Sequence, residues 1–168
     1  LYSHGWGDVA TISAVDIALW DIMGKSLDLP VHRLLGGAFR DKVPAYASGL
    51  FCKDRPDLAG ALADEARGYV DAGFTAVKMK IGFGADNDVP NVRAVREAIG
   101  EGVQLAVDAN CGYDVGSAID VGRRIAPYDL LWYEEPVPTD DVPGYREIRQ
   151  ALGLRVAGGE TLRGRWAF

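Results

Sequence analysis

The 168-residue sequence is poor in the residues that build disulfide frameworks and zinc sites. Its two cysteines, Cys52 and Cys111, are too few for a disulfide scaffold and lack the CxxC spacing of a zinc site. We expect free thiols in a reducing cytoplasm. The two histidines, His4 and His32, fall at no predicted strand end, so we favour surface or packing roles for both.

Long apolar runs and an excess of basic residues are also missing. No segment approaches the roughly 20 consecutive apolar residues of a membrane span. The net charge of −6 argues against a nucleic-acid surface. The first four residues show neither the charged nor the apolar region of a signal peptide. We therefore expect a cytoplasmic protein that binds neither membranes nor nucleic acid.

What the sequence does contain is an alternation of short apolar runs with helical patterns. Strands are predicted at 43–48, 75–80, 104–108, 130–134 and 154–158, and helices between them at 56–72, 90–99, 115–125 and 142–152. Such alternation predicts βαβ units and a parallel sheet. Within two of these strands, residues 105–107 and 130–132 form continuous apolar runs, as expected where both faces of a sheet are covered.

Two of the predicted helices have features that bear on packing. The segment 10–25 is apolar around most of its circumference, which predicts a deeply packed helix before the first strand. In the helix at 90–99, Pro90 suits the first turn, and Asp88 just upstream is a possible N-cap.

Three acidic residues recur at equal spacing along the chain. Asp108, Glu134 and Glu160 are separated by the same interval, close to the roughly 30 residues of one βα unit in a (β/α)8 barrel. A doubly wound sheet is the alternative, but it usually has a glycine-rich phosphate loop after its first strand. The segment 48–51 (SGLF) is not such a loop.

Each of these acids is predicted at the C-terminal end of its strand, where parallel α/β folds place their active sites. Three converging carboxylates would repel one another unless a cation lay between them. Oxygen ligands alone suit Mg²⁺ better than Zn²⁺. The alternative is three unrelated solvated acids; their recurrence in consecutive units favours the metal site.

A pair of lysines is the second unusual feature. Lys78 and Lys80 share one face of the predicted strand 75–80, because side chains alternate along a strand. Facing the barrel interior, they would need carboxylate neighbours, and each would lower the pKa of the other, giving a neutral amine that can act as a base. The alternative is an exposed edge strand protected by lysines.

Asn110 and Glu135 flank the predicted metal ligands. Asn110 follows Asp108 by two residues, so its amide either faces a bound ligand or lies in a turn before Gly112. Glu135 should point away from Glu134, which suggests a structural role beside the ligands.

These residues together resemble the mandelate racemase subgroup of the enolase superfamily. The resemblance rests on five motifs in order: SAVDIALWD at 13–21, KMK at 78–80, VDAN at 107–110, EEP at 134–136 and GGET at 158–161. The resemblance implies a portion of a (β/α)7β barrel, with about five parallel strands, preceded by the last helix of an α+β capping domain. We assign residues 1–40 to the end of the capping domain and residues 41–168 to the start of the barrel.

The resemblance also implies a chemistry. Asp108, Glu134 and Glu160 would hold Mg²⁺, Lys80 would be the base that removes the proton α to a substrate carboxylate, and Lys78 would tune its pKa and contact that carboxylate. Asn110 is a further substrate-binding candidate. The substrate class is a small hydroxy-carboxylate, and we expect a homo-oligomer for the full-length protein.

Several functions stay open. Dehydration of an acid sugar is slightly favoured over racemisation of a 2-hydroxy acid. A muconate-type cycloisomerase or dipeptide epimerase is an alternative, although a glutamate as third ligand argues against it. A non-catalytic fragment or assembly subunit is another, because the His/Asp dyad expected on later strands is absent from the sequence. Five strands cannot close a barrel, so we expect a partial chain.

Overall fold

The computed structural model describes residues 6–164 and 167, and the chain divides into two compact units. One unit contains the chain up to Pro44 together with the residues from Arg163 onward; the other is Ala45–Leu162. The unit boundary at residue 44 is close to the predicted domain boundary at residue 40, but the assignment of these parts to two domains stays a prediction.

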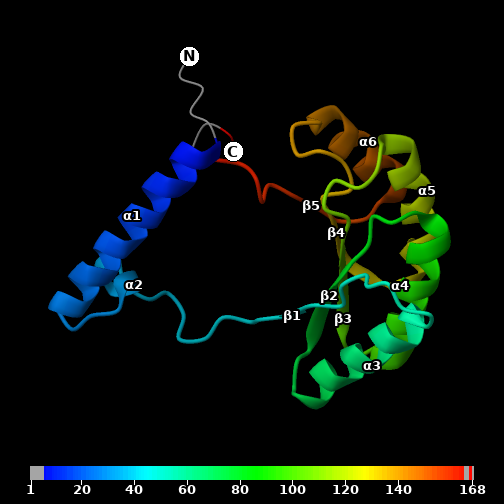
Figure 1. Cartoon of the computed structure of the whole chain (residues 1–168), viewed down its shortest axis with the longest axis horizontal. Helices are drawn as coiled ribbons and strands as arrows, with labels where there is room; N and C mark the ends of the chain where they lie inside the picture. The colour runs from blue at the N-terminus through cyan, green and yellow to red at the C-terminus, as the bar shows by residue number, and fades with distance from the viewer. Residues whose placement is uncertain (1–5, 165–166, 168) are drawn as a thin grey trace. The chain divides into compact units, whose positions relative to one another are not determined.

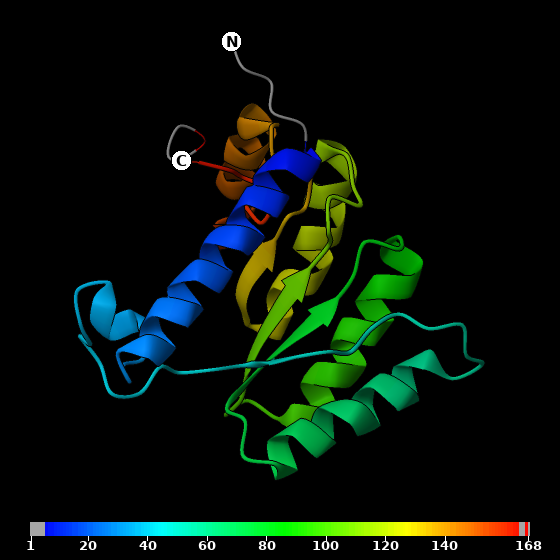
Figure 2. The same ribbon diagram turned by 60° about the vertical axis from the view of Figure 1, so that its left-hand side comes forward.

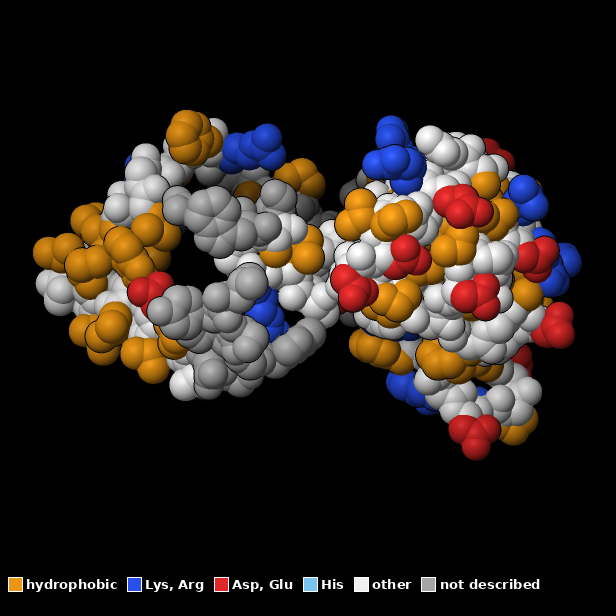
Figure 3. All heavy atoms as spheres, turned by 90° about the horizontal axis from the view of Figure 1, so that it is seen from above, with side chains coloured by type: hydrophobic (Ala, Val, Ile, Leu, Met, Phe, Trp, Pro, Cys, Tyr) orange, Lys and Arg blue, Asp and Glu red, His pale blue; other side chains and the backbone are white. Residues whose placement is uncertain are grey.

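The first unit contains two helices, α1 (Trp6–Ser26) and α2 (Val31–Leu34). The helix predicted at 10–25 is therefore present and begins earlier. Its predicted deep packing is wrong for this chain: Ile12, Ile17 and Ile22 are each more than 60% exposed. Hydrophobic side chains accordingly gather on the surface of this unit (Figure 3).

The second unit is a parallel sheet flanked by helices (Figure 1). Its strands are β1 (Ala47–Ser48), β2 (Ala76–Lys80), β3 (Gln104–Asp108), β4 (Leu130–Glu134) and β5 (Val156–Ala157). Its helices are α3 (Leu58–Asp71), α4 (Ala85–Ile99), α5 (Val115–Ile125) and α6 (Val142–Leu152), with a short 3₁₀ turn, η1, at Ala126–Tyr128. All five predicted strands are present, and β1 and β5 are shorter than predicted.

The strands lie in chain order, β1-β2-β3-β4-β5, and every adjacent pair is parallel. A doubly wound sheet would reverse its order at a switch point, so this order favours a barrel segment. The arrows of β2, β3 and β4 run side by side, and α3–α6 follow one face of the sheet (Figure 2).

The hydrophobic core lies between that face and the helices. Val77 and Met79 on β2, Leu105 and Val107 on β3 and Tyr133 on β4 are each at most 1% exposed. Alternate side chains on the same strands therefore project from the opposite face. That opposite face receives the polar side chains of Lys78, Lys80, Asp108 and Glu134.

Helix α4 begins five residues earlier than predicted, at Ala85, so Pro90 lies inside it rather than in its first turn. Asp88 is not its N-cap, because Gly84 occupies that position. The Asp88 carboxylate is 1% exposed and turns back to accept the backbone N–H groups of Gly82 (3.0 Å) and Phe83 (2.9 Å). The Tyr113 hydroxyl also donates to it.

Candidate metal centre

The three equally spaced acids come together at one end of the sheet. Asp108 ends β3 and is paired in register with Glu134 at the end of β4, while Glu160 lies three residues beyond β5. One carboxylate oxygen from each lies within 4.8 Å of the others. Asp108 is fully buried, Glu134 is half-buried and Glu160 is exposed, so the cluster opens to solvent on the side of Glu160.

The two lysines of β2 face this cluster, as the alternation of the strand predicts. Lys78 Nζ lies 2.7 Å from Glu134 Oε1 and 3.2 Å from Asp108 Oδ2. Lys80 Nζ lies 2.6 Å from Asp108 Oδ2. The lysines are thus paired with carboxylates on a central strand, so the alternative of an exposed edge strand is wrong.

These pairs shift the pKa values of their partners in opposite directions. Burial alone would raise the pKa of Asp108, but hydrogen bonds from Lys80, the Asn110 N–H and Lys78 lower it overall. Burial alone would lower the pKa of Lys78, yet hydrogen bonds to Glu134 and Asp108 raise it above its ordinary value. With these carboxylates as its partners, the pKa of Lys78 is therefore raised, and the lowering expected for the lysine pair beside a metal ion stays a prediction.

Asn110 lies in a turn, and its side-chain amide also faces the acidic cluster. Its backbone is left-handed, with φ = 43°, as in a turn, and its N–H donates to Asp108 Oδ1 (3.0 Å). Its side-chain Oδ1 accepts from Lys80 Nζ at 2.6 Å. The amide therefore lies within the cluster and touches the predicted base.

Trp132 is a member of the cluster that the sequence analysis did not identify. Its indole Nε1 donates to Glu134 Oε2 at 2.9 Å, while Oε1 of the same carboxylate accepts from Lys78. Tyr46 packs edge-on against the Trp132 ring with centroids 5.5 Å apart. Trp132 precedes Glu134 by two residues, which places both side chains on the same face of β4. This spacing in the sequence could have predicted that Trp132 lies beside the metal ligands.

A hollow of about 650 Å³ lies over the cluster. Its lining includes Lys78, Lys80, Trp132, Glu134 and Glu160. Tyr46 also lines it, so two cations, two acids and two aromatic rings face one open space, which is the composition expected of a site for a small polar ligand.

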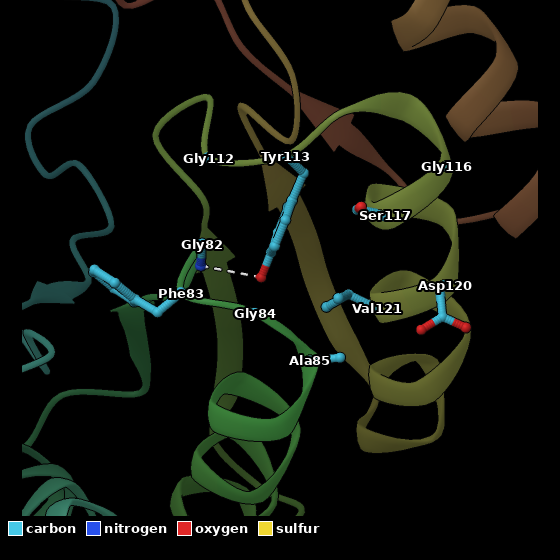
Figure 4. A pocket seen from close by; sticks show the side chains of 10 residues that line it. All are labelled: Gly82, Phe83, Gly84, Ala85, Gly112, Tyr113, Gly116, Ser117, Asp120 and Val121. Carbon is cyan, nitrogen blue, oxygen red and sulfur yellow. Dashed lines mark hydrogen bonds between the residues drawn. The ribbon is translucent and has the colours of Figure 1, made fainter.

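A second hollow, of about 660 Å³, lies between the starts of α4 and α5 (Figure 4). The Gly82 N–H donates to the Tyr113 hydroxyl across its edge at 3.1 Å. Among its lining residues Asp120 is the only charged side chain. The chemistry-bearing residues therefore lie at the first hollow, although the two are similar in size.

The remaining candidate residues lie away from the metal centre or outside the description. His32 is exposed on α2, and His4 lies outside the described residues. Cys52 and Cys111 are free thiols, as predicted. Within the described part of the chain, no helix combines the length and apolarity needed to cross a membrane.

Comparison with known families places this geometry in context. Residues 61–168 match the family model described as enolase C-terminal domain-like, and residues 2–36 match the N-terminal domain of mandelate racemase / muconate lactonizing enzyme. The chain belongs to the mandelate racemase/muconate lactonizing enzyme family of the enolase superfamily. Its five parallel strands are a portion of the barrel domain of that family, so the predicted family and fold class are confirmed.

Characterised members of this family are similar over nearly the whole chain. D-galactarolactone cycloisomerase of Agrobacterium fabrum is 44% identical over 95% of the chain, and arabinonate dehydratase of Saccharolobus solfataricus is 42% identical over 95%. The matches cover 42% and 43% of those two proteins. The chain therefore spans less than half the length of these relatives.

Solved structures of the family superpose well on this chain. The 3,6-anhydro-D-galactonate cycloisomerase of Zobellia galactanivorans gives a TM-score of 0.87 at 40% identity, covering 95% of this chain and 44% of that one. A racemase from Streptomyces coelicolor with bound magnesium gives 0.85 at 39% identity, covering 98% and 48%. Dehydratases, cycloisomerases and a magnesium-bound racemase are thus all among the relatives.

Proposed function

We propose that this chain provides the magnesium-binding half of an active site that removes the proton α to the carboxylate of an acid sugar. The observation that supports this most directly is the convergence of Asp108, Glu134 and Glu160, with an oxygen of each within 4.8 Å of the others. The related racemase with bound magnesium supports the choice of ion.

The donor set fits Mg²⁺ on chemical grounds. Mg²⁺ prefers carboxylate oxygens and retains water or substrate oxygens at its open positions. The exposure of Glu160 leaves one side of the cluster accessible for such ligands. When bound, Mg²⁺ would supply Lewis-acid stabilisation of the negative charge that develops on the substrate carboxylate.

The two lysines have different roles in this proposal: one binds the substrate carboxylate and the other removes the α proton. Hydrogen bonds to carboxylates raise the pKa of Lys78, so it stays a cation suited to binding the substrate carboxylate. Lys80 has the more exposed side chain, 20% against 9% for Lys78, and lines the hollow. We assign Lys80 as the base that accepts the α proton.

The reaction that follows proton removal is an elimination in this proposal. The electron pair left on the α carbon forms a double bond to the β carbon, and the β oxygen leaves with its bonding electrons and takes up a proton from solvent. The enol formed in this way takes up a second solvent proton at the β carbon to give the 2-keto acid, and Lys80 returns the α proton to solvent. In a dehydration that oxygen departs as water; in a lactone or anhydro-sugar cycloisomerisation it is the ring oxygen. The named activities of the dehydratase and cycloisomerase relatives support this class.

Exchange of the α proton tests the assignment of the base. With Mg²⁺ and candidate acid sugars in D₂O, the protein should introduce deuterium at the α carbon of recovered substrate wherever proton removal is reversible. The product of an elimination has a carbonyl at the α carbon, so it should carry deuterium at the β carbon; both are followed by NMR. Lys80→Met should reduce this exchange by about 100-fold or more, because general-base catalysis typically contributes 10²–10⁴-fold. Lys53→Met, an exposed lysine outside the hollow, is the matched control. Exchange that survives Lys80→Met would overturn the assignment.

Racemisation of a 2-hydroxy acid is the second candidate, favoured by the similarity to the magnesium-bound racemase. It shares the proton-removal step and differs in its product. Exchange accompanied by inversion at the α carbon, with no loss of water, would identify racemisation; loss of the β oxygen would identify elimination.

A further inference from the structure

Glu135 is a buried carboxylate that directly follows a proposed metal ligand, Glu134, in the sequence. It is 3% exposed, which is unusual for glutamate unless its charge is satisfied. Its Oε1 accepts the backbone N–H groups of Glu160 at 3.0 Å and Gly159 at 3.3 Å. The Cys111 thiol donates to Oε2 at 3.8 Å.

The backbone of Glu135 joins the same three strand ends. Its N–H donates to the carbonyl of Ala157 on β5 (2.9 Å), and its carbonyl accepts from the Cys111 N–H beyond β3 (2.7 Å). Its φ of +40° is left-handed, a conformation that costs a glutamate energy and that only surrounding contacts can maintain. Glu135 therefore connects the ends of β3, β4 and β5, from which the three proposed ligands come.

Glu160 depends on such a contact more than the other two acids do. Asp108 and Glu134 are held in strands by ladder pairing. Glu160 lies beyond β5 in a turn where Gly159 has φ = +109° and accepts from the Leu162 N–H at 3.0 Å. The two bonds to Glu135 Oε1 fix the backbone of this turn at the residue whose side chain reaches the cluster.

We propose that Glu135 is a positioning residue that sets Glu160 as the third metal ligand. The proposal rests on the proposed function for the role of Glu160, but the tie between Glu135 and the Glu160 turn does not. Holding the Glu160 turn requires an acceptor oxygen at the end of a side chain as long as that of glutamate. It does not require the negative charge of the carboxylate.

Two substitutions separate reach from charge. Glu135→Gln loses the charge but keeps an acceptor oxygen at the same distance, with its amide able to donate to Cys111. Glu135→Asp keeps the charge but shortens the side chain by one methylene, so its oxygen no longer reaches both N–H groups. Glu147→Asp, at an exposed glutamate of α6, is the matched control.

The first measurement is amide hydrogen exchange at Gly159 and Glu160, by NMR in EDTA. Glu135→Asp should exchange these two amides faster than wild type by at least tenfold, while Glu135→Gln and Glu147→Asp should remain near wild type. If the two amides exchange at the wild-type rate in Glu135→Asp, or exchange equally fast in Glu135→Gln, then the Glu135 side chain does not hold the backbone of the Glu160 turn. This result is independent of any metal.

The second measurement is Mg²⁺ affinity by calorimetry. Glu135→Asp should weaken binding by about 10–100-fold, the usual effect of losing a group that orients a ligand. In a Glu160→Gln background, Glu135→Asp should have no further effect, because its influence passes through Glu160. Additive losses would overturn the positioning role. The wild-type protein could fail to bind Mg²⁺ while the amide exchange rates of Gly159 and Glu160 still respond to Glu135→Asp as predicted. That result would refute the proposed function and the role of Glu135 in metal binding. It would support only the hydrogen bonds between Glu135 and the backbone of the Glu160 turn.

Discussion

Asp108 accepts hydrogen bonds from three donors while it is completely buried. Its Oδ2 faces Lys80 and Lys78, and its Oδ1 accepts the Asn110 N–H. A carboxylate without solvent would be costly, and these donors offset the cost by favouring its charged form. The same interactions that keep Asp108 ionised therefore prepare it to bind a cation.

The lowered pKa of Asp108 makes stability depend on pH with a defined sign. Since the folded pKa lies below the unfolded value of about 4, Asp108 contributes stability above that pH, and the contribution is lost as pH falls through the folded value. In EDTA, Asp108→Asn should be less stable than wild type at pH 7, and the difference in the free energy of unfolding should narrow as pH falls below about 4. Urea unfolding across this range measures it, with Asp71→Asn as an exposed control. A gap that stays constant with pH would contradict the assignment.

Trp132 gives a prediction for the second ligand. Trp132→Phe retains an aromatic ring against Tyr46 but removes the indole N–H that holds Glu134 Oε2. We expect Mg²⁺ binding to weaken about tenfold, because a group that orients a ligand is lost. Calorimetry measures the change, and Trp20→Phe on α1 is the control. Binding as tight as in wild type would show that the N–H does not orient Glu134.

Helix α4 shows why some elements could not be predicted from the sequence. Pro90 suits a first helical turn, and Asp88 suits an N-cap, so the pattern favoured a start near Pro90. In the structure the carboxylate of Asp88 accepts hydrogen bonds from the loop after β2 and from Tyr113 after β3, so it does not cap the helix. The Tyr113 hydroxyl is distant from Asp88 in the sequence, so the local sequence around α4 does not predict this hydrogen bond.

Asp88 therefore ties two strand ends, and its removal should be costly. Asp88→Ala leaves the N–H of Phe83 without its acceptor and weakens the bonding of Gly82 and Tyr113. We expect a loss of about 2–4 kcal/mol in the free energy of unfolding, from buried donors left unpaired. Chemical denaturation measures it. Asp86→Ala, an exposed acid in the same helix, should change stability by less than about 0.5 kcal/mol. Equal effects of the two substitutions would contradict this role.

The strands themselves were predictable, and so was much of the site. Alternation along β2 placed Lys78 and Lys80 on one face, and equal spacing of Asp108, Glu134 and Glu160 placed three acids at strand ends. The roles of Trp132 and Glu135 were not predictable to the same degree. They depend on the register between strands and on loop backbones in left-handed conformations.

At the scale of the whole molecule, the sheet of the described residues is open, with β1 and β5 as its edges. Helix α1 was predicted to be buried from its apolar composition, yet many of its side chains are exposed. Composition shows that a surface is suited to packing but not what it packs against. The chain spans less than half the length of its cycloisomerase and dehydratase relatives.

The central claim is that Asp108, Glu134 and Glu160 bind one Mg²⁺ ion. Calorimetric titration of the protein with Mg²⁺ tests it most directly, with Glu134→Gln as the loss variant and Glu147→Gln on the exposed face of α6 as the control. We predict one ion per chain in wild type and in Glu147→Gln, and no measurable binding in Glu134→Gln. Absence of binding in wild type, or binding unchanged by Glu134→Gln, would contradict the account.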